Sequence, residues 1–249
     1  MFKEERHQLI LDEVTRHNKV RSAELCRMLK VSEDTVRRDL KELADKGIVR
    51  KVHGGAVANS LIPAEYREQN IDHIGQKRII AEKALSLLQN GQVIIIDGGT
   101  SNLELVRQFP EELKATVFTN SLPIANELCT HPGIDLFIFG GKVLKNVRVA
   151  VGMDVLHFLS DLHADMCFIG ARSLHASLGI TTTRREEAQV KRKLAEVSTE
   201  VVALVTSDKI GTIQPFRVVE LEQVHTLVTE LSPKDPAVAP FREKGVRVL

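Results

Sequence analysis

The sequence predicts an N-terminal winged helix-turn-helix followed by a mostly parallel, layered α/β domain. Short helical periods and a basic hairpin fill the first sixty residues, and from about residue 75 apolar strands alternate with amphipathic helices. Runs that are apolar throughout, such as "QVIIID" at 92–97, are typical of strands covered on both faces. We expect domains at 1–57 and 75–249, joined by a mixed, proline-containing linker at 58–74.

Composition excludes several classes of protein. The chain has 249 residues, 43% of them hydrophobic, and a net charge of +1 with the positive excess in the first sixty residues. No apolar run approaches the roughly 18 residues needed to span a bilayer, and the charged beginning "MFKEERHQ" has no signal-peptide region. Cys26, Cys129 and Cys167 are far apart, which favours reduced thiols. We therefore expect a cytoplasmic protein with no membrane partner.

Three helices are expected in the first sixty residues. Ser22 and Ser32 are good N-caps for the second and third, and Gly47 supplies the residue that ends the third. The second and third helices are separated by a tight turn, as in a helix-turn-helix. The three helices are expected within residues 3–20, 20–31 and 31–47.

The third helix predicts a surface that reads DNA. Its apolar residues recur at i, i+4 and i+7 from Val36, so its arginines and Lys41 face outward together. The segment "IVRKVHGGAV" alternates apolar and basic residues and breaks at Gly-Gly, which predicts a basic wing. A charged helix face alone is usually only solvated, but the combination favours contacts to phosphates and base edges. The DNA-binding residues we expect are Ser32, Thr35, Arg37, Arg38, Lys41, Arg50, Lys51 and His53.

This N-terminal segment resembles the DNA-binding domain of the DeoR family of bacterial transcriptional regulators. The resemblance rests on "VSEDTVRRDLKEL", which is similar to the recognition helix of that family, and on "RKVHGGA" at the end of its wing. It implies a winged helix-turn-helix that reads the major groove, in agreement with the pattern of the residues themselves.

Five of the expected strands are followed by polar, glycine-rich turns. Because the carboxyl ends of parallel strands meet at one edge of a sheet, we expect these turns to converge on a crevice. Glycines allow close backbone approach, the start of a helix after the first turn suits an anion, and three cations add positive charge. Ordinary βα turn chemistry also favours such residues, but five such turns in succession with three cations favour a site for a phosphorylated sugar. The turns are "DGGTS" (97–101), "TNS" (119–121), "GGK" (140–142), "GARS" (170–173) and "SDKIG" (207–211).

The second half resembles the effector domain of the same family, whose fold is similar to ribose-5-phosphate isomerase and whose members generally sense phosphorylated sugars. The resemblance implies that Gly99, Thr100, Ser101 and Lys209 grip the phosphate, and that Asp97, Asn120, Ser121 and Lys142 contact the sugar. Arg172 stands where many relatives have a carboxylate, which points to a more acidic ligand. The effector-binding residues we expect are Asp97, Gly98, Gly99, Thr100, Ser101, Asn120, Ser121, Gly141, Lys142, Arg172 and Lys209.

The sequence favours a sensor over an enzyme. Sugar isomerisation needs a positioned base, and the segment "GARSL" contains no carboxylate. Glu186 fits a capping box with Thr183, which gives it a structural role. We expect a repressor of a sugar-metabolism operon that binds double-stranded operator DNA as a homodimer or homotetramer and is released by a phosphorylated sugar. The alternative is a sugar-phosphate isomerase-type enzyme.

No cofactor or metal is expected. The sequence has no phosphate-binding G-x-x-x-x-G-K-[ST] motif, and "DGGTSN" does not extend to a dinucleotide-binding G-x-G-x-x-G motif. His157, Asp161, His163 and Asp165 are close in sequence but lack the tight spacing of metal ligands.

Overall fold

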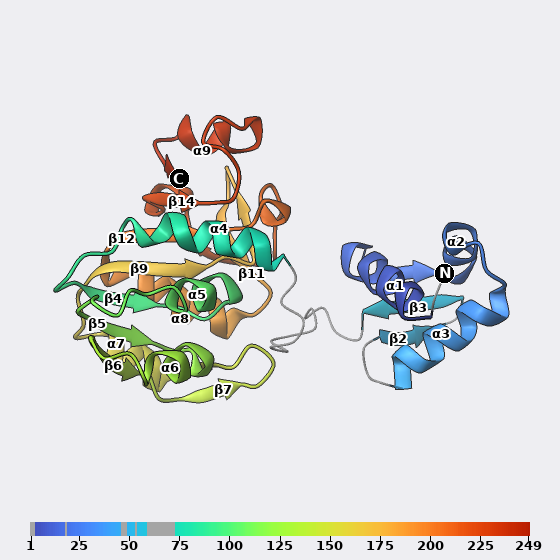
Figure 1. The fold of residues 1–249 in the computed structure, drawn as a ribbon, viewed down its shortest axis with the longest axis horizontal. Helices are drawn as coiled ribbons and strands as arrows, with labels where there is room; N and C mark the ends of the chain where they lie inside the picture. Colours follow the sequence, from blue (N-terminus) through green and yellow to red (C-terminus); the bar gives the residue numbers. More distant parts are fainter. Residues whose placement is uncertain (1–2, 18, 46–48, 53, 59–72) are drawn as a thin grey trace. The chain divides into compact units, whose positions relative to one another are not determined.

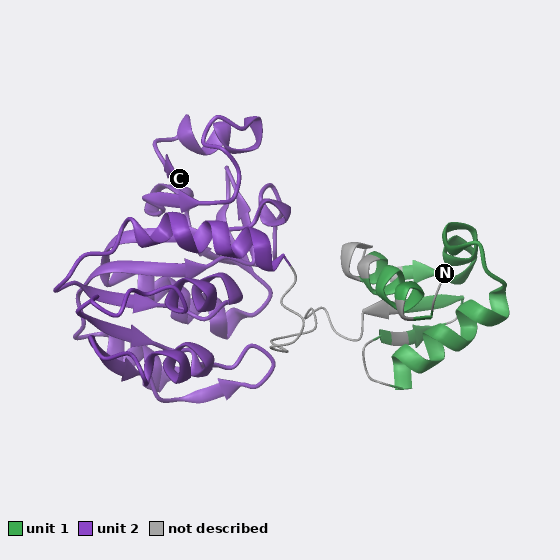
Figure 2. Cartoon of the chain, viewed as in Figure 1, with its two compact units in different colours: residues 1–65 green, residues 66–249 purple. Residues whose placement is uncertain are grey.

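The chain forms two compact units, at residues 1–65 and 66–249 (Figure 2). The structure, a computed structural model, describes residues 3–17, 19–45, 49–52, 54–58 and 73–249. The expected linker at 58–74 therefore lies almost entirely outside the described residues. Within the described residues, no helix is both long and apolar enough to cross a membrane.

The N-terminal unit is a three-helix domain with a small antiparallel sheet (Figure 1). The three helices and the hairpin of the wing are those that the sequence predicts. A third strand, β1, pairs with the second hairpin strand and was not predicted, because three residues are too few to show a strand period. Along the chain the elements are α1 (Lys3–His17), β1 (Lys19–Arg21), α2 (Ser22–Leu29), α3 (Glu33–Asp45), β2 (Val49–Val52) and β3 (Gly55–Ala58), and the strand order is β1-β3-β2.

One of the two predicted helix caps is present. The backbone N–H of Thr35 donates to the hydroxyl of Ser32 at 3.3 Å, so Ser32 caps α3 as expected. The cap predicted at Ser22 is wrong: α2 includes Ser22, and Arg21 occupies the N-cap position without a side-chain bond. The reason is that β1 runs directly into α2, so the Ser22 N–H instead donates to the carbonyl of Gly54 at 2.8 Å. Gly47, the predicted end of α3, lies outside the described residues.

A buried carboxylate fastens α3 to α1. Val36, Leu40 and Leu43 face the core as predicted, and Asp39 lies on the same buried face. Arg6 donates to both oxygens of Asp39, at 2.8 and 3.0 Å, and Nε2 of His7 lies 3.1 Å from Oδ1. Burial alone would raise the pKa of Asp39, but Arg6 and His7 outweigh it and hold the pKa below its ordinary value.

The second unit is built on a seven-stranded sheet of order β15-β14-β12-β9-β4-β5-β6 (Figure 1). Every pairing in this sheet is parallel, which confirms the predicted architecture. The strands of the sheet are β4 (Val93–Ile96), β5 (Ala115–Thr119), β6 (Ile134–Ile138), β9 (Ala164–Gly170), β12 (Ser198–Leu204), β14 (Thr226–Val228) and β15 (Arg247–Val248).

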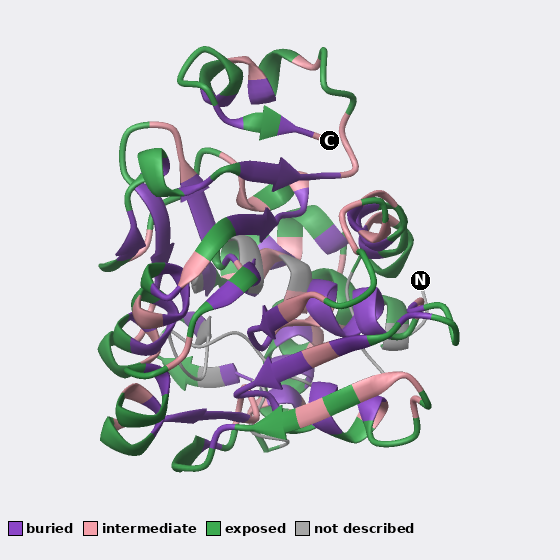
Figure 3. Cartoon of the chain, turned by 90° about the vertical axis from the view of Figure 1, so that its left-hand side faces the viewer, coloured by how far each residue is buried: buried purple, intermediate pink, exposed green. Residues whose placement is uncertain are grey.

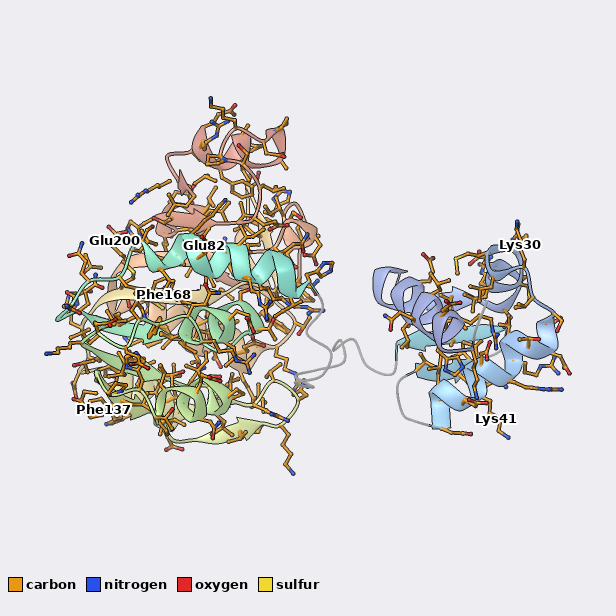
Figure 4. The ribbon with its side chains drawn as sticks, in the orientation of Figure 1. Lys30, Lys41, Glu82, Phe137, Phe168 and Glu200 are labelled. Carbon is orange, nitrogen blue, oxygen red and sulfur yellow. The ribbon has the colours of Figure 1, made fainter. Side chains whose placement is uncertain are left out.

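Helices cover both faces of the sheet. Ile94 and Ile96 pack in one apolar core with α4, α5 and α6, whereas Ile95 packs in the other with α7 and α8. Figure 3 shows the strands of the sheet interior as buried, and Figure 4 places Phe168 in this interior. The helices are α4 (Ile74–Leu85), α5 (Thr100–Val106), α6 (Leu122–Leu128), α7 (Met153–Leu159), α8 (Arg185–Glu196) and α9 (Ala239–Arg242), with short 3₁₀ turns at Ser207–Lys209, Leu221–Gln223 and Pro236–Val238.

The edge strand β6 departs from the prediction that the apolar strands are covered on both faces. Phe137 and Ile138 are 41% and 46% exposed, because no strand of the sheet follows β6 on its outer side. Phe137 is nonetheless ordered by stacking on Phe118, with ring centroids 4.7 Å apart.

Two small antiparallel additions follow strands of the main sheet and were not predicted. A hairpin follows β6, and a three-stranded sheet of order β10-β11-β13 begins directly after β9. The hairpin consists of β7 (Lys142–Leu144) and β8 (Val149–Val151), and the small sheet of β10 (Ser173–His175), β11 (Gly179–Thr182) and β13 (Phe216–Val219).

Replacing Arg6 with Met should destabilise the N-terminal unit by about 3 kcal/mol, because a buried carboxylate loses its bidentate partner. Hydrogen–deuterium exchange at the amides of α3 measures this loss. The control Lys3→Met removes an exposed pair with Glu42 and should cost less than about 1 kcal/mol. Equal effects of the two substitutions would contradict a structural role for the Arg6–Asp39 pair.

Candidate functional site

The sheet has a topological switch point between β4 and β9. From β4 the chain proceeds outward to β5 and β6 on one side, whereas β9, β12, β14 and β15 follow one another on the other side. The loops after β4 and β9 therefore leave the sheet in opposite directions and open a crevice at its carboxyl edge, where ligands bind in open α/β sheets.

A buried ion pair and its hydrogen bonds to Gly170, together called the clasp, join β4 and β9 at this point. Oδ2 of Asp97, the first residue after β4, accepts from the backbone N–H of Gly170 at 3.1 Å and from Nζ of Lys191 on α8. Nζ of Lys191 also donates to the carbonyl of Gly170 at 2.7 Å. Glycine is required at 170, because a Cβ there would lie 2.4 Å from the carbonyl oxygen of Gly98. The clasp thus fixes β4, β9 and α8 with respect to one another.

Lys191 is charged despite its burial. Burial alone would lower its pKa, but the carboxylates of Asp97 and Glu187 outweigh this and raise the pKa. The carboxylate of Glu187 lies 3.4 Å from Nζ of Lys191, one turn away on the same helix. Both carboxylates are therefore held in ion pairs at the bottom of the crevice.

The loops after β4 and β5 are bonded to each other. The backbone N–H of Gly98 donates to Oδ1 of Asn120 at 3.2 Å. Asn102 in α5 donates from Nδ2 to the carbonyls of Asp97 at 2.7 Å and of Phe168 at 3.1 Å. These bonds bring the predicted residues Asp97, Gly98 and Asn120 together. They also hold the first turn of α5 above the switch point.

The segment Gly99–Thr100–Ser101 forms the entry to α5. Gly99 is the N-cap residue with φ of +143°, a conformation that favours glycine, and no side chain caps the helix. The amides of the first helical turn have no acceptor within the helix, so they are directed toward the crevice mouth. Ser101 is buried, whereas Gly99 and Thr100 are half-buried.

Cations from three further elements surround the crevice. Lys209 lies in the turn after β12, Arg172 follows β9, and Lys77 stands in the first turn of α4. Burial, with the neighbouring Lys77, Arg172 and Lys191 acting in the same direction against Asp208, lowers the pKa of Lys209 to about 8. Burial also lowers the pKa of Arg172, opposed by Glu187 and Asp208. Because Lys77, Arg172 and Lys191 all lower the pKa of Lys209, these positive charges lie in one region around Lys209.

Unpartnered polar atoms gather at the same edge of the sheet. In the described part of the chain, seven buried side-chain nitrogen or oxygen atoms have no hydrogen-bond partner. Buried polar atoms normally bond to protein, water or ligand, so such a concentration marks a polar cavity lining. Six of the seven directly follow a strand of the main sheet or open a helix at its carboxyl edge, and Asn146 lies in the β7–β8 turn; the seven are Gln76, Asp97, Asn102, Ser121, Asn146, Arg184 and Thr206.

Gly141 and Lys142, which were predicted to contact the effector, instead lie against β8 and α8. Lys142 begins β7 and bonds at 2.8 Å to the exposed carboxylate of Glu186. Gly141 has φ of +152°, and a Cβ there would lie 2.9 Å from the carbonyl oxygen of Val151. The predicted capping box of Thr183 and Glu186 is wrong, because α8 begins one residue later, with Arg184 as N-cap and no side-chain cap bond.

The predicted DNA-binding side chains lie on one exposed face of α3. Arg37 and Arg38 are 63% and 80% exposed, and each pairs loosely, at 3.5 Å, with an acidic residue one turn earlier. Lys41 is also exposed and extends from α3 in Figure 4. These arginines are therefore available to an external partner, since such exposed pairs are weak.

The remaining predicted DNA contacts are distributed over the cap and the wing. Ser32 is exposed and Thr35 half-buried, and their hydroxyls bond each other at 2.9 Å at the start of α3. Lys51 is exposed on β2, and Arg50 is its neighbour on that strand. His53 lies outside the described residues.

Lys77 and Lys191 were not among the site residues predicted from the sequence. A usable signal was present, since Lys77 and Lys191 occupy positions on the apolar stripes of their helices. Lys77 is followed by buried residues at i+3, i+4 and i+7, and Lys191 stands between buried Ala188 and Leu194. A lysine at such a position must find a buried partner or a ligand. Among the described residues, no group of three or more His, Cys, Asp or Glu residues could hold a metal ion.

Replacing Lys191 with Met should lower the free energy of unfolding of the sensor unit by about 3–5 kcal/mol, because Asp97 is left buried without its cation. Thermal and urea denaturation of the full chain measure the loss. Lys193→Met, on the same helix, removes only a partly exposed pair with Glu196 and should cost less than about 1 kcal/mol. A Lys191 variant as stable as this control would show that the clasp contributes nothing to stability.

Comparison with known proteins agrees with this arrangement. Residues 6–61 match the DeoR-like helix-turn-helix domain, and residues 72–231 match the DeoR C-terminal sensor domain. The transcriptional regulator GolR of Listeria innocua is 32% identical over 100% of this chain and 98% of its own length, and the transcriptional repressor GlcR of Bacillus subtilis is 30% identical over 100% and 96%. Among solved structures, ribose 5-phosphate isomerase A of Methanocaldococcus jannaschii is 18% identical over 53% of this chain, with a TM-score of 0.40, and the match spans 52% of that chain. The domain that binds DNA and the domain that senses an effector therefore correspond to the two units, and the chain belongs to the DeoR family of transcriptional regulators.

Proposed function

We propose that the protein represses a sugar-metabolism operon and is released from its operator by a phosphorylated sugar. The N-terminal unit binds double-stranded operator DNA through α3 and the wing, and the crevice at the switch point binds the sugar phosphate. The cluster of Lys77, Arg172 and Lys209 at the carboxyl edge of the sheet is the observation that carries this proposal. Two relatives support the repressing sign: the repressor GlcR, and a putative aga operon transcriptional repressor of Escherichia coli that is 24% identical over 98% of this chain.

The crevice suits a ligand with one dianionic group and several hydroxyls. The phosphate group is neutralised by the cations and bonded by the first-turn amides of α5. Ser121 and Thr206 each bring a buried hydroxyl without a partner to the same edge, which supports contacts to sugar hydroxyls. Asp97 contacts the sugar only through Oδ1, because Oδ2 is occupied by Gly170 and Lys191.

Release follows from linkage between the two ligands. If the sugar phosphate favours an arrangement of the chain that binds operator less well, operator DNA must weaken sugar-phosphate binding by the same factor. A homodimer or homotetramer would place winged helices on two half-sites, each α3 entering the major groove.

Alanine substitutions in α3 separate two kinds of DNA contact. Arg37→Ala should weaken operator binding by about 1–3 kcal/mol and relax sequence preference, as expected for a contact to base edges. Lys41→Ala should weaken binding to all sequences and reduce the salt slope by about one, as expected for a phosphate contact. Fluorescence anisotropy with the upstream region of its own operon and a scrambled duplex, over a salt series, measures both. Salt-independent binding, or none, would count against repression.

A thermal-shift screen with pentose and hexose phosphates and their free sugars tests the effector. The sugar phosphate that is the effector should raise the melting temperature and release the operator, whereas its free sugar should do neither. Because the pKa of Lys209 is about 8 and a bound dianion needs its proton, affinity should fall by up to about tenfold between pH 7 and pH 9.

Affinity for the sugar phosphate should also fall below about pH 6, where a phosphate monoester becomes a monoanion. Lys209→Met serves as the control: it should bind the sugar phosphate more weakly and show no decline between pH 7 and pH 9. If no phosphorylated sugar stabilises the wild-type chain, the proposed effector class is wrong.

A further inference from the structure

Helix α4 is the first element of the sensor unit after the expected linker, and its first turn lies at the crevice. A helix that precedes a strand of a parallel sheet runs opposite to it, so α4 begins at the carboxyl edge and ends at the amino edge of β4. In Figure 1, α4 lies in front of the sheet beside α5, and the carbonyl of Arg78 accepts a bond of 3.4 Å from Gln108, just after α5. The chain from the DNA-binding unit thus enters the sensor unit at the edge that carries the candidate effector site.

Lys77 places a positive charge from α4 into this region. It is 5% exposed and lies on the buried stripe of the helix with Ile80, Ala81 and Ala84. Its charge acts on Lys209, across the crevice in the turn after β12. Gln76, its neighbour in the first turn, holds a buried side-chain oxygen without a partner. The first turn of α4 is therefore part of the crevice lining rather than only part of the core.

A second connection joins α4 to the turn that carries Lys209. Nζ of Lys83 donates to the carbonyls of Thr229 at 2.7 Å and Leu231 at 2.9 Å, on either side of Glu230. The carboxylate of Glu230 accepts from the backbone N–H of Ser207 at 3.1 and 3.2 Å, two residues before Lys209. A change in the position of the 207–211 turn is thereby transmitted through Glu230 and its neighbours to Lys83 on α4.

The entry to α4 has an uncommon backbone conformation and no side-chain cap. His73 is the N-cap residue, with no side-chain cap bond and with φ of +62°, which is an uncommon conformation for a residue other than glycine. An uncapped helix end with a strained entry changes at low cost compared with a capped one. Movement of the first turn then displaces the point at which the linker attaches.

We propose that Lys77 is a ligand for the anionic group of the effector, and that α4, joined to the 207–211 turn through Lys83, transmits anion binding to the linker and thereby to the DNA-binding unit. The inference rests on the proposed function. A dianion bound between Lys77 and Lys209 removes their repulsion and draws the first turn of α4 toward the turn after β12. The effector thus changes the operator affinity through α4, the element of the sensor unit that follows the DNA-binding unit most closely in the sequence.

Full-length Lys77→Gln and Lys83→Gln variants, with Lys114→Gln as control, test the two parts separately. Lys114 is an exposed lysine before β5, at the opposite edge of the sheet. Inorganic phosphate is the probe, compared with chloride at equal ionic strength. Its binding is measured by thermal shift, its effect on residues 74–85 by hydrogen–deuterium exchange, and its effect on operator affinity by fluorescence anisotropy.

Wild type and Lys114→Gln should bind phosphate, slow exchange in the first turn of α4 and lose operator affinity. Lys77→Gln should bind phosphate roughly tenfold more weakly than wild type does. Lys83→Gln should bind phosphate as wild type does, yet show neither the change in exchange nor the loss of operator affinity. Lys83→Arg, which keeps the charge and the donors, should restore the response and shows that the Lys83→Gln chain did not simply misfold.

Wild-type phosphate binding by Lys77→Gln, or a wild-type operator response in Lys83→Gln, would overturn the inference while the proposed function stands. Phosphate that binds wild type without altering exchange in α4 would overturn it as well. If neither phosphate nor any sugar phosphate stabilises wild type, the proposed function itself fails.

Discussion

The ion pair between Asp97 and Lys191 at the switch point is the constraint on which the sensor unit depends. Asp97 follows β4, Lys191 belongs to α8, and both bond to Gly170 at the end of β9, so three elements distant in sequence meet at one buried point. A buried charge without its partner is strongly destabilising, which means that the helix and the two strands can adopt only one register with respect to each other. The carbonyl of Gly98 excludes any side chain at residue 170, so the backbone after β4 and the end of β9 approach each other closely at this point.

The N-terminal unit uses the same physical device for a different purpose. Asp39 lies on the buried face of α3 and is held by Arg6 and His7 of α1, while the opposite face of the helix presents its arginines to solvent. The direction in which α3 presents those arginines is therefore set by a polar bond and not only by apolar contacts, which would tolerate rotation more easily. In both units a buried carboxylate orients the element that carries the candidate binding residues.

The period of apolar residues was enough to predict α1 to α6, α8 and the long strands, but not α7 or α9. The topology of parallel strands was enough to predict that the turns after β4 and β5 meet. The apolar period was insufficient where strands have three residues, as in β1, β7 and β8, because so short a segment shows no period. Ion pairs between residues distant in the sequence could not be predicted from the apolar period either. Nothing near Lys142 in the sequence indicates that its partner is Glu186. Charged residues on apolar stripes, such as Asp39 and Lys191, are the signal that a sequence does provide for such pairs.

Under the proposed function, the electrostatics of the crevice favour binding of a sugar phosphate over its transformation. A general base needs a carboxylate that is free to accept a proton near the carbonyl carbon of the sugar. Here Asp97 and Glu187 pair with Lys191, and Glu186 pairs with Lys142; burial raises the pKa of Asp97, although Lys191 opposes that rise. Lys77, Arg172 and Lys191 repel the positive charge of Lys209. An arriving dianion relieves that repulsion, and the free energy so gained is available for moving α4 rather than for chemistry, since no proton acceptor among these groups is released by binding.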